Sequence, residues 1–226
     1  MVERFPDEFI TWQHTTYPGI HVDEVFGMDS KNGKIWNELA LQIFKEMNGD
    51  YREVSHFSNG APYIEGYAGR ISLTHTNHFL AVAILPKTPE TDLSIFKPRT
   101  AMGIDAESLD RTQVLKVRPK FLSEAELLLV PEDNLEKNII AWTSKEAIFK
   151  AGFKEGVDFI NDLELIKLPE IMPSPLKGNN ESLGEGNLYF DNNGIRDSIS
   201  FKLFSYESYG CCVTLAYNTK IAKFSK

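Results

Sequence analysis

Hydrophobic side chains recur at helical spacing in two long segments of the chain. Between residues 34 and 47 they mark one side of a predicted amphipathic helix, which Asn-Gly-Asp at residues 48–50 ends. Between residues 134 and 153 a second helical pattern places five large apolar residues on one side, namely Leu135, Ile139, Trp142, Phe149 and Phe153. A shorter helix is predicted for residues 123–129. Each half of the chain is therefore expected to contain one substantial helix.

Short apolar runs between turn-forming residues predict strands along much of the remaining chain. The predicted strands cover residues 51–57, 63–66, 70–74, 79–85, 101–107, 158–168, 198–206 and 211–217. Residues 1–30 show no clear period, and residues 86–100 contain three prolines, which predicts a connector. Residues 173–194 are rich in proline, glycine and asparagine, which predicts a long exposed loop or a hairpin tip.

The order of these elements is similar in the two halves of the chain. Each half has a helix and several strands and closes on an apolar strand, at residues 78–84 and 210–216. This order predicts the α+β class, with two units divided near residue 100, so that residues 1–100 and 101–226 form separate domains. Sequence identity between the halves is too low to establish a duplication.

Composition and charge narrow the class of protein. The chain has 226 residues, of which 42% are hydrophobic and 25% charged, as in globular proteins. Its longest apolar run, Phe79 to Leu85, is too short to span a bilayer, and the first six residues contain no apolar signal core. The formal net charge of -8 argues against a general nucleic-acid binder. Cys211 and Cys212 are neighbours in a predicted strand and point to opposite faces, so we expect free thiols and a cytoplasmic location.

Acidic side chains stand out in two of the predicted elements. In the strand at residues 102–107, alternation places Gly103, Asp105 and Glu107 on one face. Such a pair of carboxylates alone is typical of a solvated strand edge. Glu146 lies within the apolar side of the long helix, where a carboxylate must be paired, protonated or bound to a cation.

The simplest account of Glu146 is a surface ion pair with Lys150, one helical turn further along. Together with Asp105 and Glu107, however, Glu146 becomes a candidate ligand in a site built from oxygen atoms. Such ligands suit Mg²⁺ and leave room for phosphate oxygens and water. Histidine or cysteine ligands that would complete a zinc site do not accompany them in the sequence.

Two spaced motifs carry a resemblance to a known family. Gly-Ile-Asp-Ala-Glu at residues 103–107 is followed after 34 residues by Trp-Thr-Ser-Lys-Glu-Ala-Ile-Phe-Lys at residues 142–150. This pair resembles the G-[IV]-D-x-E strand and the W-[ST]-x-K-E-[AS]-x-x-K helix of the 4′-phosphopantetheinyl transferase superfamily. Residues 70–76 resemble its apolar strand ending in S-H-S, and residues 120–126 its [KR]-F-[FL]-S-x-x-E motif. The length resembles the long, single-chain, pseudo-dimeric type known from activators of peptide synthetases.

The resemblance implies an enzyme that moves the 4′-phosphopantetheine group of coenzyme A to a serine hydroxyl of an apo acyl or peptidyl carrier protein. It also implies two related α+β halves, each a helix packed on a small, mainly antiparallel sheet, with coenzyme A bound between them. By the same resemblance, Mg²⁺ or Mn²⁺ would be held by Asp105, Glu107 and Glu146. Adenosine 3′,5′-bisphosphate would be the leaving group.

The remaining candidate roles also follow from the matched motifs. Glu146 is a candidate base for the serine proton, directly or through water. Lys145 and Lys150 are candidates for binding the phosphates or the leaving group, because they are cations on the same helix. His75 is expected to contact a phosphate of the nucleotide, although a strand-end histidine with a purely structural role would look the same in sequence.

The carrier proteins that this family modifies are typically acidic, so docking on a chain of net charge -8 requires a local basic surface. Lys116, Arg118 and Lys120 alternate along the sequence and would face one way in an extended segment, with Val117 behind them. We therefore expect this segment to dock the carrier. A solvated strand edge protected by basic residues is the alternative.

Two departures from the family pattern favour other functions. The basic residue of a G-[KR]-P motif is replaced by Ala61, and the first helix offers Lys31, Lys34 and Lys45 instead of arginines. These departures leave open a degenerate member that binds coenzyme A or a carrier without turnover. A third possibility is a Mg²⁺-dependent phosphohydrolase that shares only the carboxylate chemistry.

Overall fold

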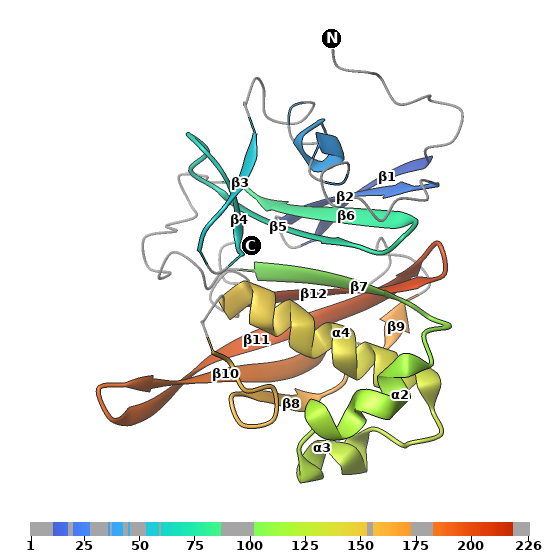
Figure 1. Ribbon diagram of the computed structural model, residues 1–226, viewed down its shortest axis with the longest axis vertical. Helices are drawn as coiled ribbons and strands as arrows, with labels where there is room; N and C mark the ends of the chain where they lie inside the picture. The colour runs from blue at the N-terminus through green and yellow to red at the C-terminus, as the bar shows by residue number, and fades with distance from the viewer. Residues whose placement is uncertain are drawn as a thin grey trace.

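Two β-sheets, formed from residues before and after residue 100, lie face to face in the structure (Figure 1). The structure is a computed structural model. It describes residues 11–17, 20–27, 36, 38–42, 45, 53–58, 60–86, 102–152, 156–172 and 183–218, and the side chains of all of these except residues 11–17 and 192. The predicted boundary near residue 100 falls within residues 87–101, outside the described part.

The first sheet has four antiparallel strands in the order β1-β2-β6-β5. Their bounds are β1 Thr11–Tyr17, β2 Ile20–Phe26, β5 Arg70–His75 and β6 Phe79–Leu85. A separate two-stranded sheet pairs β3 (Val54–His56) with β4 (Pro62–Ile64). Residues 36, 38–42 and 45 are helical, as predicted for residues 34–47. Trp36, Leu39 and Ala40 of this helix are buried against the four-stranded sheet.

The second sheet is larger and follows the order β7-β12-β11-β10-β8 through antiparallel pairs, with β9 beside β11 in parallel. The bounds are β7 Met102–Ser108, β8 Leu163–Lys167, β9 Ile171–Met172, β10 Gly184–Asn192, β11 Ile195–Ser208 and β12 Cys211–Asn218. An Asn-Gly turn at residues 193–194 joins β10 to β11, and both of its residues have positive φ.

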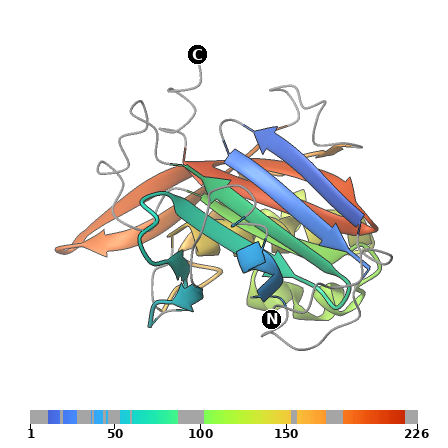
Figure 2. The ribbon, with the colours of Figure 1, turned by 90° about the horizontal axis from the view of Figure 1, so that it is seen from above.

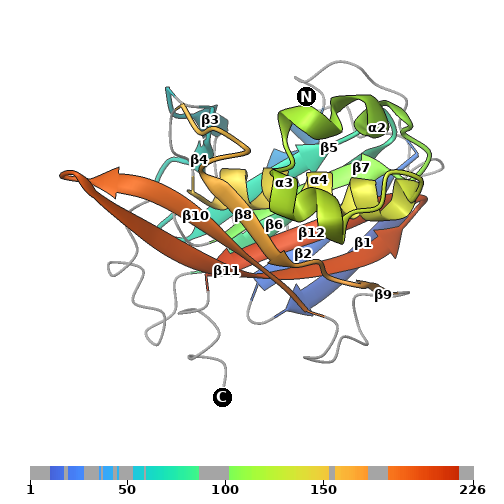
Figure 3. The same cartoon turned by 90° about the horizontal axis from the view of Figure 1, so that it is seen from below.

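Helices cover the face of the second sheet that points away from the first (Figure 3). Their bounds are α2 Gln113–Val117, the 3₁₀ helix η3 Arg118–Lys120, α3 Glu124–Leu129 and α4 Leu135–Gly152. The helix α3 begins at a capping box, in which Ser123 and Glu126 exchange hydrogen bonds with each other's backbone N–H groups. No helix among the described residues is long and apolar enough to cross a membrane.

The molecule is thus layered as helix, sheet, sheet and helices (Figures 1 and 2). Strands β6 and β12 lie inside their sheets, and every residue of both is buried. A strand covered on both faces carries apolar residues at successive positions instead of alternating ones. This burial explains the two continuous apolar runs in the sequence.

Side chains from the first sheet satisfy the free edge of the second. One edge of β7 pairs with β12, and on the other edge the backbone N–H groups of Ile104 and Ala106 donate to the hydroxyls of Ser72 and Thr74 at 3.1 and 3.2 Å. These two hydroxyls, on β5, are buried. Strand β5 is thereby fixed alongside β7 without forming a ladder with it.

Helix α4 packs closely against β7 and β12. A Cβ atom added to Gly103 would lie 2.2 Å from the carbonyl oxygen of Ala147, so the strand and helix approach too closely for a side chain there. A buried chain of hydroxyl contacts fastens the same helix, with Thr143 Oγ1 2.8 Å from Thr214 Oγ1 and Thr214 Oγ1 2.7 Å from Ser205 Oγ. These contacts fix the position of α4 relative to the acidic strand.

The predicted α+β class with mainly antiparallel sheets is confirmed. A kinship between the two halves remains a prediction. The expected extended form of residues 116–120 was wrong, because this segment is helical. Within the predicted loop or hairpin tip, residues 184–192 form β10, and the hairpin turn itself lies at residues 193–194. Residues 173–182 of the predicted loop lie outside the described residues. The hairpin β1–β2 has no counterpart among the predicted elements.

Candidate active site

Strand β7 presents its acidic face to α4, as the alternation along the strand predicts. Asp105 and Glu107 are 7% and 8% exposed, and Gly103 on the same face contacts the helix backbone. Two carboxylates that are this buried need compensating charge, because water screens them poorly. The structure supplies that charge from two basic side chains.

Asp105 is held by α4 and by the first sheet together. The Lys150 ammonium donates to Asp105 Oδ1 at 2.6 Å, and the Thr74 hydroxyl donates to the same oxygen at 3.0 Å. The backbone N–H of Ala106 in turn donates to Thr74, which fixes that hydroxyl. The candidate site therefore lies between β7 and α4, at the edge of β7 that runs beside β5.

Glu107 is held by its own strand end. Its Oε2 atom accepts from the Arg111 guanidinium, and its Oε1 atom accepts from the Ser108 backbone N–H at 3.0 Å. Arg111 follows the turn that ends β7 and folds back over the strand. Motif matching does not point to this arginine, although a basic residue four positions after a candidate ligand is a signal that could have found it.

Glu146 lies on α4 beside the two β7 carboxylates. The pKa of this carboxyl is raised from 4.5 to about 7, mainly by burial and also by the negative charge of Asp105, while the charges of Lys150 and Arg111 oppose the rise. A carboxyl in this environment is well suited to accept a proton near neutral pH.

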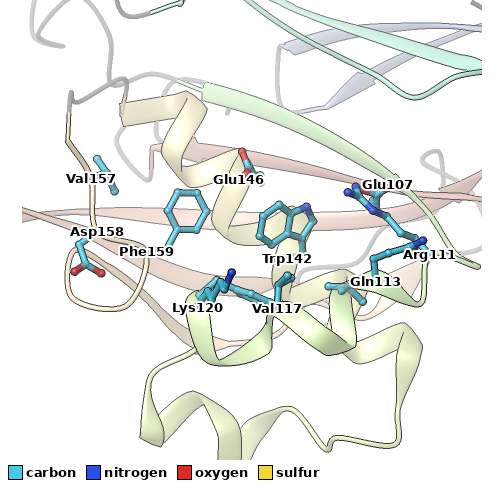
Figure 4. A pocket seen from close by; sticks show the side chains of 12 residues that line it. Glu107, Arg111, Gln113, Val117, Lys120, Trp142, Glu146, Val157, Asp158 and Phe159 are labelled. Atoms are coloured by element: carbon cyan, nitrogen blue, oxygen red, sulfur yellow. The ribbon is translucent and has the colours of Figure 1, made fainter. Parts of the chain in front are cut away.

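A cavity of about 540 Å³ opens next to Glu146 (Figure 4). Trp142 lies in its middle, Glu107 and Arg111 lie at one end, and Asp158 and Phe159 lie at the other. Its apolar lining consists of Val114, Val117, Phe121, Trp142, Val157 and Phe159. The cavity therefore combines an apolar lining with a carboxylate at each end and Glu146 between them.

Trp142 of α4 lines this cavity, and Phe149 lies on the same side of the helix, whereas Ala147 and Ala151 lie close to β7. Trp142 and Phe149 are half-buried, and their rings lie 6.1 and 5.6 Å from that of Phe159, whereas Ala147 and Ala151 are fully buried. The close approach of β7 at Gly103 leaves no space for large side chains at these two positions. Glu146 thus belongs to the cavity wall. Phe153 lies outside the described residues.

A second cavity, of about 730 Å³, adjoins the first at the end of β5. It is lined by the turn between β5 and β6, including His75 and His78, and by Tyr209 and Phe26, whose rings stack 4.7 Å apart. Glu107, Arg111 and Gln113 line both cavities. The two cavities therefore meet at the end of the acidic strand.

His75 lines the second cavity, and its ring stacks 5.6 Å from that of Trp36 in the first helix. Burial lowers the pKa of this imidazole, and the positive charge of Lys150 lowers it further. The side chain is exposed, so it is accessible to a ligand. Its expected contact with a nucleotide phosphate remains a prediction.

Lys145 does not face either cavity, contrary to its expected contact with phosphate. Its ammonium is fully buried and pairs with Glu126 Oε2 at 2.6 Å. It also donates to the carbonyl oxygens of Phe121, Phe159 and Leu163 at 2.7, 2.7 and 3.0 Å. Burial lowers the pKa of Lys145, and Glu126 opposes that shift. A lysine with four oxygen neighbours has no proton to offer a ligand, so its role is structural.

The expected basic docking face is only partly present. Residues 116–120 are helical, which turns Arg118 inward, where it is 7% exposed and donates to the Val130 carbonyl at 2.5 Å. Lys116 and Lys120 remain exposed, and Lys120 lines the first cavity. The idea of three aligned basic side chains is therefore wrong, while two of them stay accessible.

The donor set at this site fits a hard divalent cation by its chemistry. Asp105 and Glu107 face α4 from one strand, and Glu146 faces them from the helix, within range of the charge of Asp105. Carboxylate oxygens of this kind suit Mg²⁺. Within the described part of the chain, no three acidic, histidine or cysteine side chains are gathered tightly enough to enclose an ion as they stand. Lys150 and Arg111 hold the two β7 carboxylates instead.

Comparison with known proteins agrees with the motif resemblance. No curated protein matches the chain. A family model described as the 4′-phosphopantetheinyl transferase superfamily matches residues 101–185. The match covers β7, α2, α3, α4 and β8, including Asp105, Glu107, Glu146 and Lys150. The long pseudo-dimeric type remains a prediction. The similarity to the 4′-phosphopantetheinyl transferase superfamily therefore covers residues 101–185.

Proposed function

We propose that the protein transfers the 4′-phosphopantetheine group from coenzyme A to a serine hydroxyl of an apo acyl or peptidyl carrier protein. The observation that carries the proposal is the meeting of Asp105, Glu107, Glu146 and Lys150 between β7 and α4, where Glu107 lines both cavities and Glu146 lines the first. The superfamily match supports phosphopantetheinyl transfer in general. The carrier, coenzyme A and the divalent cation are the finer parts of the proposal.

Asp105, Glu107 and Glu146 would hold Mg²⁺ or Mn²⁺, which neutralises negative charge on the pyrophosphate when bound. The serine oxygen attacks the β-phosphorus of coenzyme A, forming a new P–O bond. The P–O bond to adenosine 3′,5′-bisphosphate breaks, and that group leaves with the bonding electrons. Glu146 accepts the serine proton, directly or through water, since its pKa of about 7 permits it to do so near neutral pH.

Two basic groups at the site are placed to bind phosphate. Lys150 is 23% exposed, and His75 is exposed and lines the second cavity, so both retain access to a ligand. We propose that residues 101–226 form the unit that carries the metal and catalytic groups. Residues 1–100 would supply His75 and the opposite wall of the nucleotide site.

The test is incubation of the protein with coenzyme A, Mg²⁺ and a panel of apo carrier proteins, followed by intact mass measurement of each carrier. We expect one carrier to gain the mass of a phosphopantetheine group. Asp105→Ala and excess chelator should each abolish that gain, and full turnover under either condition would remove the cation from the mechanism. Phosphate release without a mass gain would indicate a phosphohydrolase instead.

Ala61 supplies the observation that favours a second candidate, a protein that binds coenzyme A or a carrier without turnover. Ala61 is buried, so the side chain at this position reaches no ligand. Binding of coenzyme A in the absence of any mass gain across the carrier panel would favour this second function.

A further inference from the structure

Arg111 occupies a position that no candidate role has yet accounted for. It lies beyond the end of β7, at the turn closed by the hydrogen bond from its own N–H to the Ser108 carbonyl. It lines both cavities, together with Glu107 and Gln113. Figure 4 shows its side chain beside Glu107, at the end of the first cavity. An arginine at this place can reach a ligand that extends from one cavity into the other.

In the structure the Arg111 guanidinium is paired with Glu107, one of the carboxylates proposed to hold the cation. The arginine side chain is 48% exposed, whereas the glutamate side chain is 11% exposed. Lys150 pairs with Asp105 in a similar way, but it is 23% exposed and its partner is also fixed by Thr74. Arg111 is therefore the more easily moved of these two cations.

We propose that Arg111 is a phosphate-binding residue that is held on Glu107 until that carboxylate binds a divalent cation. The inference rests on the proposed function, because it requires a cation and a phosphate-bearing substrate at the same site. With its charge compensated by the cation, Glu107 attracts the guanidinium less strongly. Arg111 then turns toward the phosphates of coenzyme A at the junction of the cavities.

Arg111 is expected to oppose cation binding while it is paired with Glu107 and to favour coenzyme A binding once it is released. While paired with Glu107, the guanidinium opposes binding of a second cation, because like charges repel. After release, its planar fork of N–H donors matches phosphate oxygens in a way that an ammonium does not. Removal of Arg111 should therefore strengthen cation binding and weaken coenzyme A binding.

The experiment compares the wild type with Arg111→Gln, Arg111→Lys and Arg196→Gln. Arg196 is an exposed arginine on β11, so its variant makes the same chemical change away from the cavities. Calorimetric titration with MnCl₂ alone should show about three- to fivefold tighter binding by Arg111→Gln, the scale expected for a half-exposed ion pair. Titration with coenzyme A in the presence of Mg²⁺ should show about tenfold weaker binding by this variant.

Arg111→Lys should bind Mn²⁺ like the wild type and coenzyme A more weakly, since it retains the charge and loses the fork. Arg196→Gln should match the wild type in both titrations. Equal coenzyme A affinity for Arg111→Gln and Arg196→Gln would overturn the inference and leave Arg111 as a surface ion pair. A wild-type chain that binds neither Mn²⁺ nor coenzyme A would overturn the proposed function itself, and this inference with it.

Discussion

Glu146 has two proposed roles, as a ligand of the divalent cation and as the base that accepts the serine proton. Glu146→Gln keeps the size of the side chain and its place between β7 and the cavity, so we expect normal folding. The rate of carrier modification should fall by at least ~100-fold, the scale expected when a general base or metal ligand is lost. Initial rates from intact mass, with circular dichroism as the folding control, test this. Near-wild-type turnover would place the base elsewhere.

The raised pKa of Glu146 also makes the stability of the protein depend on pH. The unfolded carboxyl ionises near 4.5 and the folded one near 7, so the folded state holds the proton more tightly between these values. Stability contributed by the neutral form is therefore present below pH 4.5 and is lost as pH rises to about 7. In the presence of chelator, the free energy of unfolding of the wild type should fall by about 1–3 kcal/mol over this pH range relative to that of Glu146→Gln.

Urea denaturation at pH 5 and pH 8 measures this difference, and Glu170→Gln, which removes an exposed carboxylate, is the matched control. Addition of Mg²⁺ at pH 8 should restore stability to the wild type and have little effect on Glu146→Gln. A pH dependence that is the same in the wild type and in both variants would refute the assigned electrostatics.

At the residue scale, sequence patterns could predict where Asp105, Glu107 and Glu146 lie, because strand and helix periods decide which faces they share. They could not predict the partner of each charged group. Lys145 and Glu146 are neighbours in one motif, yet one enters the core and the other faces a cavity. Their environments are set by α3, β8 and the close approach of Gly103, which are contacts between distant segments.

At the element scale, the buried pair of Lys145 and Glu126 joins α4 to α3 and β8. Glu126 also accepts from the Leu165 N–H at 2.7 Å, and Lys145 donates to the Leu163 carbonyl, so the pair satisfies the outer edge of β8. It also holds Phe121 and Phe159, which form walls of the first cavity. The pair therefore acts as a support for the cavity.

Lys145→Met should lower the free energy of unfolding by about 3–5 kcal/mol, because it leaves Glu126 buried without its partner. The double variant Lys145→Met/Glu126→Gln should lose less than the sum of the two single changes. Chemical denaturation of the two single variants and the double variant measures these changes. Lys137→Met, on the exposed side of the same helix, is the control and should change the free energy of unfolding by about 0.5 kcal/mol or less. Strict additivity of the two changes would show that the residues do not act as a pair.

Some elements could be predicted from the sequence and others could not, for identifiable reasons. The apolar runs of β6 and β12 are long and bounded by turns, and α3 has a capping box, so local signals specify them. Basic side chains alternate along residues 116–120, which suggests an extended segment, but the end of α2 and η3 form there because Val114 and Phe121 bury against α4. Tertiary packing outweighs local alternation in this segment.

At the scale of the whole molecule, the proposed carrier must approach a protein of net charge -8. Lys116 and Lys120 are exposed on the helical segment beside the first cavity, and Lys120 lines it. Reversal of both to Glu should raise the KM for an acidic carrier at least about fivefold and leave that for coenzyme A nearly unchanged, because the positive charges favour encounter with a negative partner.

Added salt should slow the wild type more than the reversed variant, since screening removes the same attraction. Lys137→Glu/Lys167→Glu makes the same change in net charge at exposed positions away from the cavity mouth and serves as the control. An unchanged KM for the carrier in the Lys116/Lys120 variant would show that the carrier docks on another surface.

The hydroxyl contacts of Ser72 and Thr74 with β7 have a consequence for attempts to divide the protein. Residues 101–226 produced alone would expose both an apolar sheet face and the backbone N–H groups of Ile104 and Ala106. A bare strand edge beside an apolar face promotes self-association. The two fragments should aggregate separately and complement each other when produced together. If each fragment were fused to one of two interacting proteins, binding of those proteins would bring the fragments together and restore the fold. The fragments would then serve as a split reporter of that interaction.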